Sequence, residues 1–209
     1  MIQKFALAGI HTGIGKTIAA AVLSEALNAD YWKPVQAGIE ETDTDTIKLL
    51  LDNGNKRVFP EAYLLTKPAS PHEAAKEEGI KIDLKKFIFP KTNNKLIVET
   101  AGGVHSPITE NETMVDFMKY YNLPTILVSK NYLGSINHTL LSIDVLKSKG
   151  IHLLGIIMNG ETNKLSETFI EEYGKVPIIA RIPHFEIISK NTISCFANTI
   201  KDELCKLFI

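Results

Sequence analysis

Short apolar runs alternate along the chain with stretches of helical periodicity. Six runs of four to six residues are rich in Ile, Val and Leu and predict buried β-strands: Lys4–Ala8, Asp30–Lys33, Lys95–Thr100, Thr125–Ser129, Leu153–Met158 and Val176–Ile179. Runs of this kind, without polar alternation, are typical of parallel sheets that are covered on both faces.

Helices are expected between these strands, at Lys16–Asn28, Asp45–Leu51, Thr113–Tyr121, Ser135–Lys149, Leu165–Glu172 and Asn191–Leu207. The alternation predicts an α/β fold in which a mostly parallel sheet lies between two layers of helices. We interpret residues 1–209 as one domain. Residues 53–94 are less regular because prolines interrupt them, and we interpret them as a loop-rich insertion with a short helix at His72–Glu78.

Composition narrows the class of protein. A formal net charge of −1 gives no electrostatic reason to expect nucleic acid or an anionic membrane as a partner. Cys195 and Cys205 have no Cys/His cluster around them, which favours ordinary reduced thiols over a metal site or a disulfide. The chain has no apolar run of about 18 residues, and its start lacks the apolar length of a signal peptide. We therefore expect a cytoplasmic protein.

The first strand leads into GIHTGIGKT, residues 9–17, and then into a helix. Glycines in such a turn allow backbone N–H groups to point at a phosphate, and the helix dipole adds to the attraction. Lys16 would reach the β- and γ-phosphates, and the Thr17 hydroxyl would bind Mg²⁺. The spacing of the glycines differs from that of the usual phosphate loop. Counted back from Gly15, the first glycine of that pattern would stand at position 10, which is Ile here, and Gly9 comes one residue earlier. The alternative is a glycine-rich turn that serves packing alone. The predicted nucleotide-binding residues of this loop are Gly13, Ile14, Gly15, Lys16, Thr17 and Ile18.

Two further segments place charges near this loop. KLIVET is an apolar strand that reaches Glu99 just before a pair of glycines, a position where metal-binding acids occur in such folds; the alternative is a solvated acid. Lys33 follows the second strand, where Pro34 forces a loop, so it is expected to point into the same crevice unless it is only a surface charge. In TDTD, Asp43 is best explained as the cap of the next helix, which leaves Asp45 as a second acid.

Five strings occur in order, GIHTGIGKT, KPVQAG, SPHEAA, ETAGG and LGSINHTLL, and together they resemble the dethiobiotin synthetase family of the P-loop NTPase superfamily. The resemblance implies an ATP-dependent ligase of biotin biosynthesis that forms C–N bonds. In this family 7,8-diaminononanoate and CO₂ (or bicarbonate) give a carbamate, ATP phosphorylates it, and the second amine closes the ureido ring. The products are dethiobiotin, ADP and phosphate.

The resemblance also implies roles for individual residues. Thr12 and Lys33 would contact the carbamate and the transferring phosphoryl group, Lys16 would neutralise phosphate charge, and Thr17, Asp45 and Glu99 would hold Mg²⁺. Further nucleotide contacts are expected at Thr100, Ala101, Gly102, Asn159, Gly160, Ile182, Pro183 and His184, with Asn159 on the adenine. Further substrate contacts are expected at Ala37, Gly134, Ser135 and Asn137.

A homodimer with shared substrate sites is part of the same expectation. The start of the helix at Ser135 has free backbone N–H groups that favour an anion, and the family resemblance places the substrate carboxylate on this turn of the partner subunit. The alternative is that Ser135 only caps its helix.

Four positions depart from the family pattern. His11 replaces Asp or Asn, Ala37 replaces Ser or Thr, Thr100 replaces Gly, and His184 replaces an aromatic residue. None of these changes removes a charge that the chemistry requires.

Other functions remain as alternatives. A partition or septum-site ATPase switch would carry a signature Lys at the position of His11. A cobyrinate-type amide ligase would need a longer chain. A module that only binds ATP would not explain Lys33 together with the carboxylates.

Overall fold

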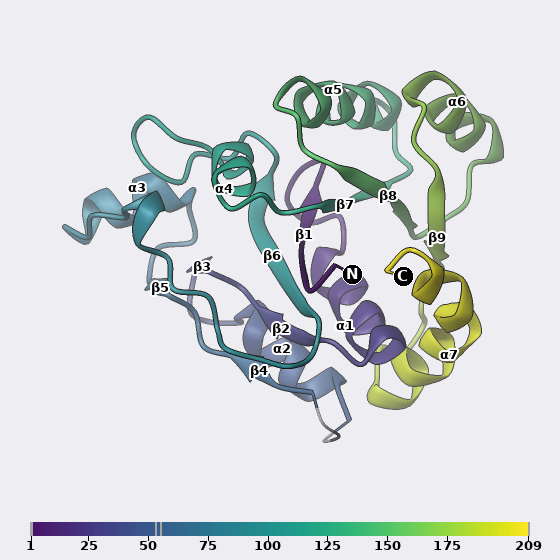
Figure 1. Cartoon of the computed structure of the whole chain (residues 1–209), viewed down its shortest axis with the longest axis horizontal. Coiled ribbons are helices and arrows are strands. Elements are labelled where there is room, and N and C mark those ends of the chain that lie inside the picture. Colours follow the sequence, from purple (N-terminus) through teal and green to yellow (C-terminus); the bar gives the residue numbers. More distant parts are fainter. Residues whose placement is uncertain (1, 53, 55, 209) are drawn as a thin grey trace.

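The computed structural model describes residues 2–52, 54 and 56–208. Asn53, where the predicted insertion begins, lies outside the described residues, as do Met1 and Ile209 at the ends of the predicted domain. A parallel seven-stranded sheet with the order β4-β2-β6-β1-β7-β8-β9 forms the centre of the molecule (Figure 1). Its strands are β1 (Lys4–Gly9), β2 (Asp30–Trp32), β4 (Val58–Phe59), β6 (Leu96–Gly103), β7 (Thr125–Lys130), β8 (Leu153–Asn159) and β9 (Ile178–Ile182).

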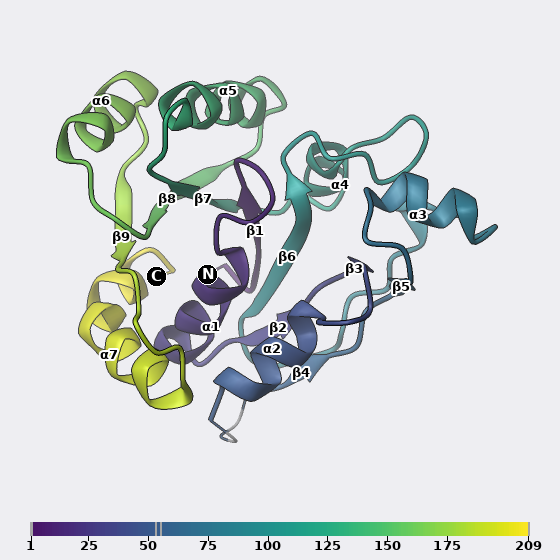
Figure 2. The ribbon, with the colours of Figure 1, turned by 180° about the vertical axis from the view of Figure 1, so that it is seen from behind.

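Helices cover both faces of this sheet. On one face α1 (Lys16–Leu27) packs against α2 (Asp43–Leu50) and α7 (Lys190–Lys206). On the other face lie α4 (Met114–Tyr120) and α5 (Ser135–Ser148), and α6 (Lys164–Gly174) runs beside α5 in both views (Figures 1 and 2). The predicted three-layer α/β fold is confirmed. Within the described residues, no helix has the length and apolar character that a bilayer span requires.

The segment after α2 contains more regular structure than its sequence predicts. β4 joins the edge of the main sheet. β5 (Tyr63–Leu65) pairs in parallel with β3 (Val35–Ala37), a strand that precedes α2, and the two form a separate small sheet. α3 (Pro71–Glu77) matches the predicted short helix, and a 3₁₀ turn follows at Leu84–Lys86. β3, β4 and β5 have only two or three residues each, which is too few for a recognisable period, and the sequence did not reveal them.

The core is centred on β1. Its residues Phe5–Ala8 are fully buried because the strand lies between β6 and β7 with helices on both sides. Small residues Ala19–Ala21 allow α1 to pack closely against the sheet. The carboxyl ends of the parallel strands meet at one edge, and ligands of open α/β sheets bind at that edge. The loop after β1 therefore opens at the place where a ligand is expected.

Candidate active site

The loop between β1 and α1 adopts the conformation expected of a phosphate loop. Gly13 and Gly15 have φ angles of 71° and 86°, in the left-handed region that favours glycine. Gly15 is the N-cap of α1 and supplies no side-chain cap, so the first N–H groups of the helix are left for a ligand. Ile14 is buried beneath the loop, whereas Thr12 is exposed at its tip and Ile18 is half-buried in α1. This geometry supports anion binding at the helix start.

Lys16 is buried at the same helix start. Its Nζ donates to the carbonyl oxygen of His11 at 3.3 Å, so the side chain folds back over the loop. Burial lowers the pKa of Lys16 to about 8; the Glu99 charge partly offsets this effect and the nearby Lys33 adds to it. A bound polyphosphate would favour the charged form again, because it brings negative charge to this ammonium group.

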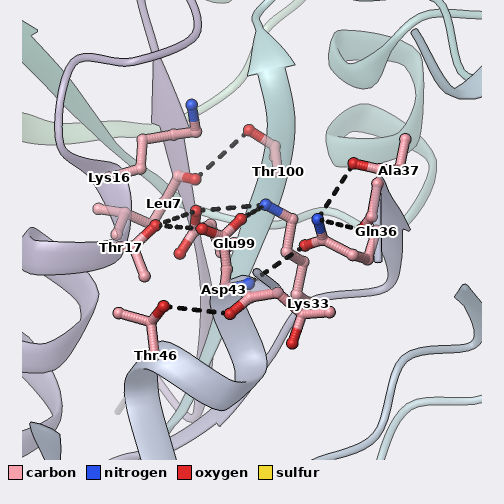
Figure 3. Close-up of polar contacts among 12 residues, drawn as sticks. Leu7, Lys16, Thr17, Lys33, Gln36, Ala37, Asp43, Thr46, Glu99 and Thr100 are labelled. Carbon is pink, nitrogen blue, oxygen red and sulfur yellow. Dashed lines mark hydrogen bonds and ion pairs between the residues drawn. The ribbon is translucent and has the colours of Figure 1, made fainter. Parts of the chain in front are cut away.

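Lys33 lies at the centre of the second cluster of charges. Its Nζ is paired with Asp43 Oδ2 and lies 3.6 Å from Glu99 Oε1. From α1, Thr17 Oγ1 donates to Asp43 Oδ1 at 2.6 Å and lies 3.4 Å from Glu99 Oε1. Figure 3 shows the Lys33 ammonium group between the two acids, while the Lys16 side chain points away from them. Residues from α1, α2, β6 and the end of β2 thus meet at one point.

The structure places Asp45 apart from the other residues expected to hold a metal. Thr42 is the N-cap of α2, and its side chain accepts from the backbone N–H of Asp45 at 3.0 Å. Asp43 is therefore the first helical residue and faces Thr17. Asp45 is exposed and pairs with Lys48 at 3.0 Å, away from the phosphate loop. Of the two acids, Asp43 contacts Thr17 and Lys33 beside the phosphate loop, and Asp45 does not.

Glu99 has a further partner that the sequence did not suggest. The hydroxyl group of fully buried Tyr31 donates to Glu99 Oε2 at 3.0 Å. Tyr31 pairs with Ile97 in the β2–β6 register, so Tyr31 and Glu99 lie on the same side of the sheet. Burial raises the pKa of Tyr31 well above its ordinary value, and the charges of Glu99 and Glu61 raise it further. The phenol therefore acts as a hydrogen-bond donor.

These donors suit a hard cation. Thr17, Asp43 and Glu99 offer only oxygen atoms, and Mg²⁺ in nucleotide sites is held by one or two carboxylates together with phosphate oxygens and water. No group of three or more His, Cys, Asp or Glu side chains that could hold a metal ion occurs in the described part of the chain. Thr17, Asp43 and Glu99 are thus the residues that could hold such a cation beside the phosphate loop.

The carboxyl ends of β8 and β9 lie beside the phosphate loop. Asn159 pairs with Ile182 in the register of these strands, and the Gly160 N–H donates to the Ile182 carbonyl at 2.8 Å. Asn159 Nδ2 also donates to the carbonyl oxygen of Ile14 at 2.8 Å. A Cβ atom at Gly15 would lie 1.9 Å from this amide nitrogen, so the glycine is required for the contact. Asn159 thus braces the phosphate loop. Pro183 and His184 are exposed beyond β9.

The end of β6 is held by internal contacts. Thr100 is buried, and its hydroxyl group donates to the carbonyl oxygen of Leu7 at 3.4 Å, so this departure from the family pattern links β6 to β1. Half-buried Ala101 follows, and Gly102 has a φ of 65°; a Cβ atom there would lie 2.2 Å from the Ser106 hydroxyl oxygen. Gly102 and Thr12 line one hollow of about 500 Å³. The predicted contacts on the two loops therefore lie side by side.

The predicted substrate residues are divided between separate places. Ala37 ends β3, and the Gln36 side chain next to it accepts from the Asp43 N–H at 3.4 Å. Gly134, Ser135 and Asn137 line another hollow of about 760 Å³ at the start of α5, together with the loop that precedes α6. Gly134, with a φ of 99°, is the N-cap of α5 and supplies no side-chain cap, so Ser135 is not the cap. Within one chain, no described contact joins this turn to Lys33.

His11 links the phosphate loop to the loop before α5. Its ring packs edge-on against Tyr132 at 5.6 Å and lies 6.4 Å from the ring of His138. The hydroxyl group of Tyr132 is 2.7 Å from His138 Nδ1. This second departure from the family pattern is thus packed against the chain's own aromatic residues.

Comparisons with known proteins agree with this geometry. A family model described as an AAA domain matches residues 3–192. An ATP-dependent dethiobiotin synthetase BioD of Cytophaga hutchinsonii is 43% identical over 202 residues, covering 96% of this chain and 98% of the relative. Another, of Christiangramia forsetii, is 40% identical over 208 residues, covering 99% of this chain and all of the relative (100%).

Solved structures show the same fold at lower identity. A ParA family ATPase of Chlorobium tepidum has a TM-score of 0.57 at 15% identity and covers 94% of this chain and 97% of that one. The septum site-determining protein MinD of Pyrococcus horikoshii, complexed with Mg-ADP, has a TM-score of 0.57 at 16% identity and covers 98% of this chain and 97% of that one. At such identities the likeness concerns the fold alone.

Proposed function

Because this chain belongs to the family of ATP-dependent dethiobiotin synthetases, we propose that it closes the ureido ring of dethiobiotin from 7,8-diaminononanoate, CO₂ and ATP. Family membership confirms the resemblance found in the five sequence strings. The observation that carries the proposal is the buried Lys33, held between Asp43 and Glu99 beside the phosphate loop. A module that only bound ATP would not need a cation at this position.

The reaction has two group transfers. One amine of the substrate first adds to CO₂ and loses a proton, which gives the carbamate. A carbamate oxygen then attacks the γ-phosphorus of ATP, the bond to the β-phosphate oxygen breaks, and ADP leaves. The second amine then attacks the carbamoyl carbon, phosphate leaves with its bonding electrons, and the ring closes with loss of a proton. Neither step needs a covalent bond to the enzyme, so the protein acts through position and charge.

Each residue has a task in this scheme. The N–H groups from Gly13 to Thr17 bind the phosphates, and Lys16 in its charged form neutralises the charge that develops on the leaving ADP. Lys33 binds the carbamate and the transferring phosphoryl group. Asp43 and Glu99, with Thr17, would hold Mg²⁺, which supplies Lewis-acid stabilisation of the phosphate oxygens when bound.

The direct test is product formation. The protein is incubated with 7,8-diaminononanoate, bicarbonate, Mg²⁺ and ATP, and dethiobiotin is measured by mass spectrometry alongside phosphate release. A reaction without the diamine is the control. The proposal requires one phosphate released for each dethiobiotin formed, and phosphate release without ring product would refute it.

The substrate site is proposed to be shared between the subunits of a homodimer. The uncapped start of α5, with Gly134 and Asn137, offers N–H groups to an anion, and the substrate has a carboxylate far from its diamine end. Chains carrying Lys33→Ala are mixed with chains carrying Asn137→Asp. A shared site predicts partial return of activity, because each mixed dimer then has one site built only from intact parts and one site that contains both alterations. No recovery in dimers shown to be mixed would mean that each chain builds its own site.

The partition or septum-site ATPase is the alternative function. The solved structures that carry these names share the fold at 12–16% identity, whereas the synthetases named above match at 40% or more over nearly the whole chain. Position 11 is His and not the signature Lys of those ATPases. The synthetase function is therefore better supported.

A further inference from the structure

The two oxygens of the Glu99 carboxylate face different partners. Oε1 lies 3.4 Å from the Thr17 hydroxyl and 3.6 Å from Lys33 Nζ, on the side of the phosphate loop. Oε2 accepts the hydrogen bond of Tyr31 at 3.0 Å on the side of β2. Glu99 is 1% exposed and Tyr31 is fully buried, so both contacts lie away from bulk solvent.

Tyr31 is well placed to hold this acid. It lies in the middle of β2 and pairs with Ile97 of β6 on one side and with Val58 of β4 on the other. Its backbone is therefore fixed by two neighbouring strands, and burial restricts its ring to few rotamers. A phenol held in this way presents its hydroxyl group at a constant position.

Glu99 needs such a restraint because a cation lies beside it. Lys33 carries a positive charge 3.6 Å from Oε1, and rotation of the carboxylate about its last bond would bring Oε2 toward the same ammonium group. Without the Tyr31 hydroxyl group, Oε2 would also be a buried acceptor without a partner, which is a costly arrangement. Both effects would turn the carboxylate away from its present orientation.

We propose that Tyr31 is a positioning residue that holds Oε2 of Glu99 so that only Oε1 is presented to the cation of a bound Mg–nucleotide. This inference rests on the metal-binding role proposed above for Glu99. It assigns to Tyr31 a part in metal affinity, although the tyrosine touches neither nucleotide nor substrate. Residues that orient metal ligands commonly change metal affinity 10- to 100-fold when they are replaced.

The test uses Tyr31→Phe, which removes one oxygen atom and keeps the ring. Tyr121→Phe is the matched control, because the Tyr121 hydroxyl group also donates inside the protein, to the carbonyl oxygens of Leu84 and Phe87 at 3.0 and 3.2 Å, but away from the site. Binding of the ATP analogue AMPPNP is measured by calorimetry over a series of Mg²⁺ concentrations and in EDTA, without the diamine. Thermal melting of both variants verifies that they are folded.

We expect Tyr31→Phe to need about tenfold more Mg²⁺ for half-maximal enhancement of AMPPNP binding, with unchanged affinity in EDTA. Tyr121→Phe should keep the Mg²⁺ dependence of the unaltered protein. An unchanged Mg²⁺ requirement in Tyr31→Phe would overturn the proposal. A loss that is the same with and without Mg²⁺ would overturn it too, because it would indicate a general structural effect.

A second comparison locates the effect on Glu99. In a Glu99→Gln background, the Tyr31→Phe change should add little to the Mg²⁺ requirement, since the ligand it orients is already gone. An equal additional loss in both backgrounds would mean that Tyr31 acts elsewhere. The result is separate from the ring-closure assay: a Mg²⁺ effect without dethiobiotin would refute only the proposed reaction, and dethiobiotin formation without a Mg²⁺ effect would refute only this inference.

Discussion

Exchanging Asp43 for Asn should raise the Mg²⁺ requirement of the enzyme, whereas the same change at Asp45 should leave it unaltered. The two acids are two residues apart in one helix, so the pair of variants tests position with the chemistry held constant. Asp43 accepts from Thr17 at 2.6 Å and pairs with Lys33; Asp45 is exposed and contacts Thr42 and Lys48.

The size of the effect follows from these contacts. A hydrogen bond to a charged group contributes about 1.5–3 kcal/mol, and a neutral amide is a poorer ligand for a hard cation. A loss of about 2–3 kcal/mol corresponds to a roughly 30- to 150-fold weaker response to Mg²⁺. In Asp43→Asn, Lys33 keeps Glu99 as a charged partner at 3.6 Å, and at an effective dielectric constant of 20 their direct attraction is about 4–5 kcal/mol before the cost of desolvation. The buried ammonium group is therefore not left unpaired in the variant.

The assay is dethiobiotin formation at saturating ATP over a range of Mg²⁺ concentrations, with thermal melting to compare the folds of the two variants. Asp43→Asn should show the shifted Mg²⁺ curve, and Asp45→Asn should superimpose on the unaltered protein. Equal curves for the two variants, or a larger shift for Asp45→Asn, would refute the assignment of Asp43 as the ligand.

Three further predictions concern the lysines and the brace of the phosphate loop. Lys33→Ala should lower turnover about a hundredfold or more while ATP affinity changes little, because the Lys33 charge acts on the transition state. Equal losses of turnover and of ATP affinity would mean that Lys33 binds the ground state and the transition state equally. Since the pKa of Lys16 is about 8 in the free protein and phosphates favour its charged form, ATP binding should take up protons at pH 8.5 but not at pH 6.5. Calorimetry in buffers of different ionisation enthalpy measures this uptake, and its absence at pH 8.5 would contradict the burial argument. Asn159→Ala should weaken binding of inorganic triphosphate, which has no base, by about tenfold, the value of one hydrogen bond. Unchanged triphosphate binding would restrict Asn159 to contacts with the base.

The long apolar strands and the phosphate loop were predictable because each depends on local pattern. β1, β7 and β8 were predicted to within one residue at either end. β6 runs three residues beyond the predicted Thr100, because Gly103 still pairs with Gly9 across the sheet. No propensity favours glycine in a strand, so this extension comes from the neighbouring strand and not from local sequence.

The features of the site that the sequence did not place depend on tertiary contacts. Threonine and aspartate both cap helices, and TDTD offers several possible caps in a row. The packing of α2 against α1 decides which of these residues faces Thr17. Local sequence patterns carry no information about that packing. Tyr31 lies in β2 two residues before Lys33, but its partner Glu99 is 68 residues away. Only the parallel register of β2 and β6 brings them together.

The central place of β1 also has a consequence for the synthesis of the protein. Both strands that flank it come late in the chain, β6 beginning at Leu96 and β7 at Thr125. While a ribosome makes the first ninety or so residues, at about 5–20 residues per second, the apolar β1 and α1 have emerged but no neighbouring strand exists to pair with them. For several seconds the nascent chain therefore exposes the segment that later forms the centre of its core. Such long-range pairing folds slowly and exposes the chain to aggregation, so chaperones that bind apolar segments should engage this protein at its amino-terminal end before β7 has been translated.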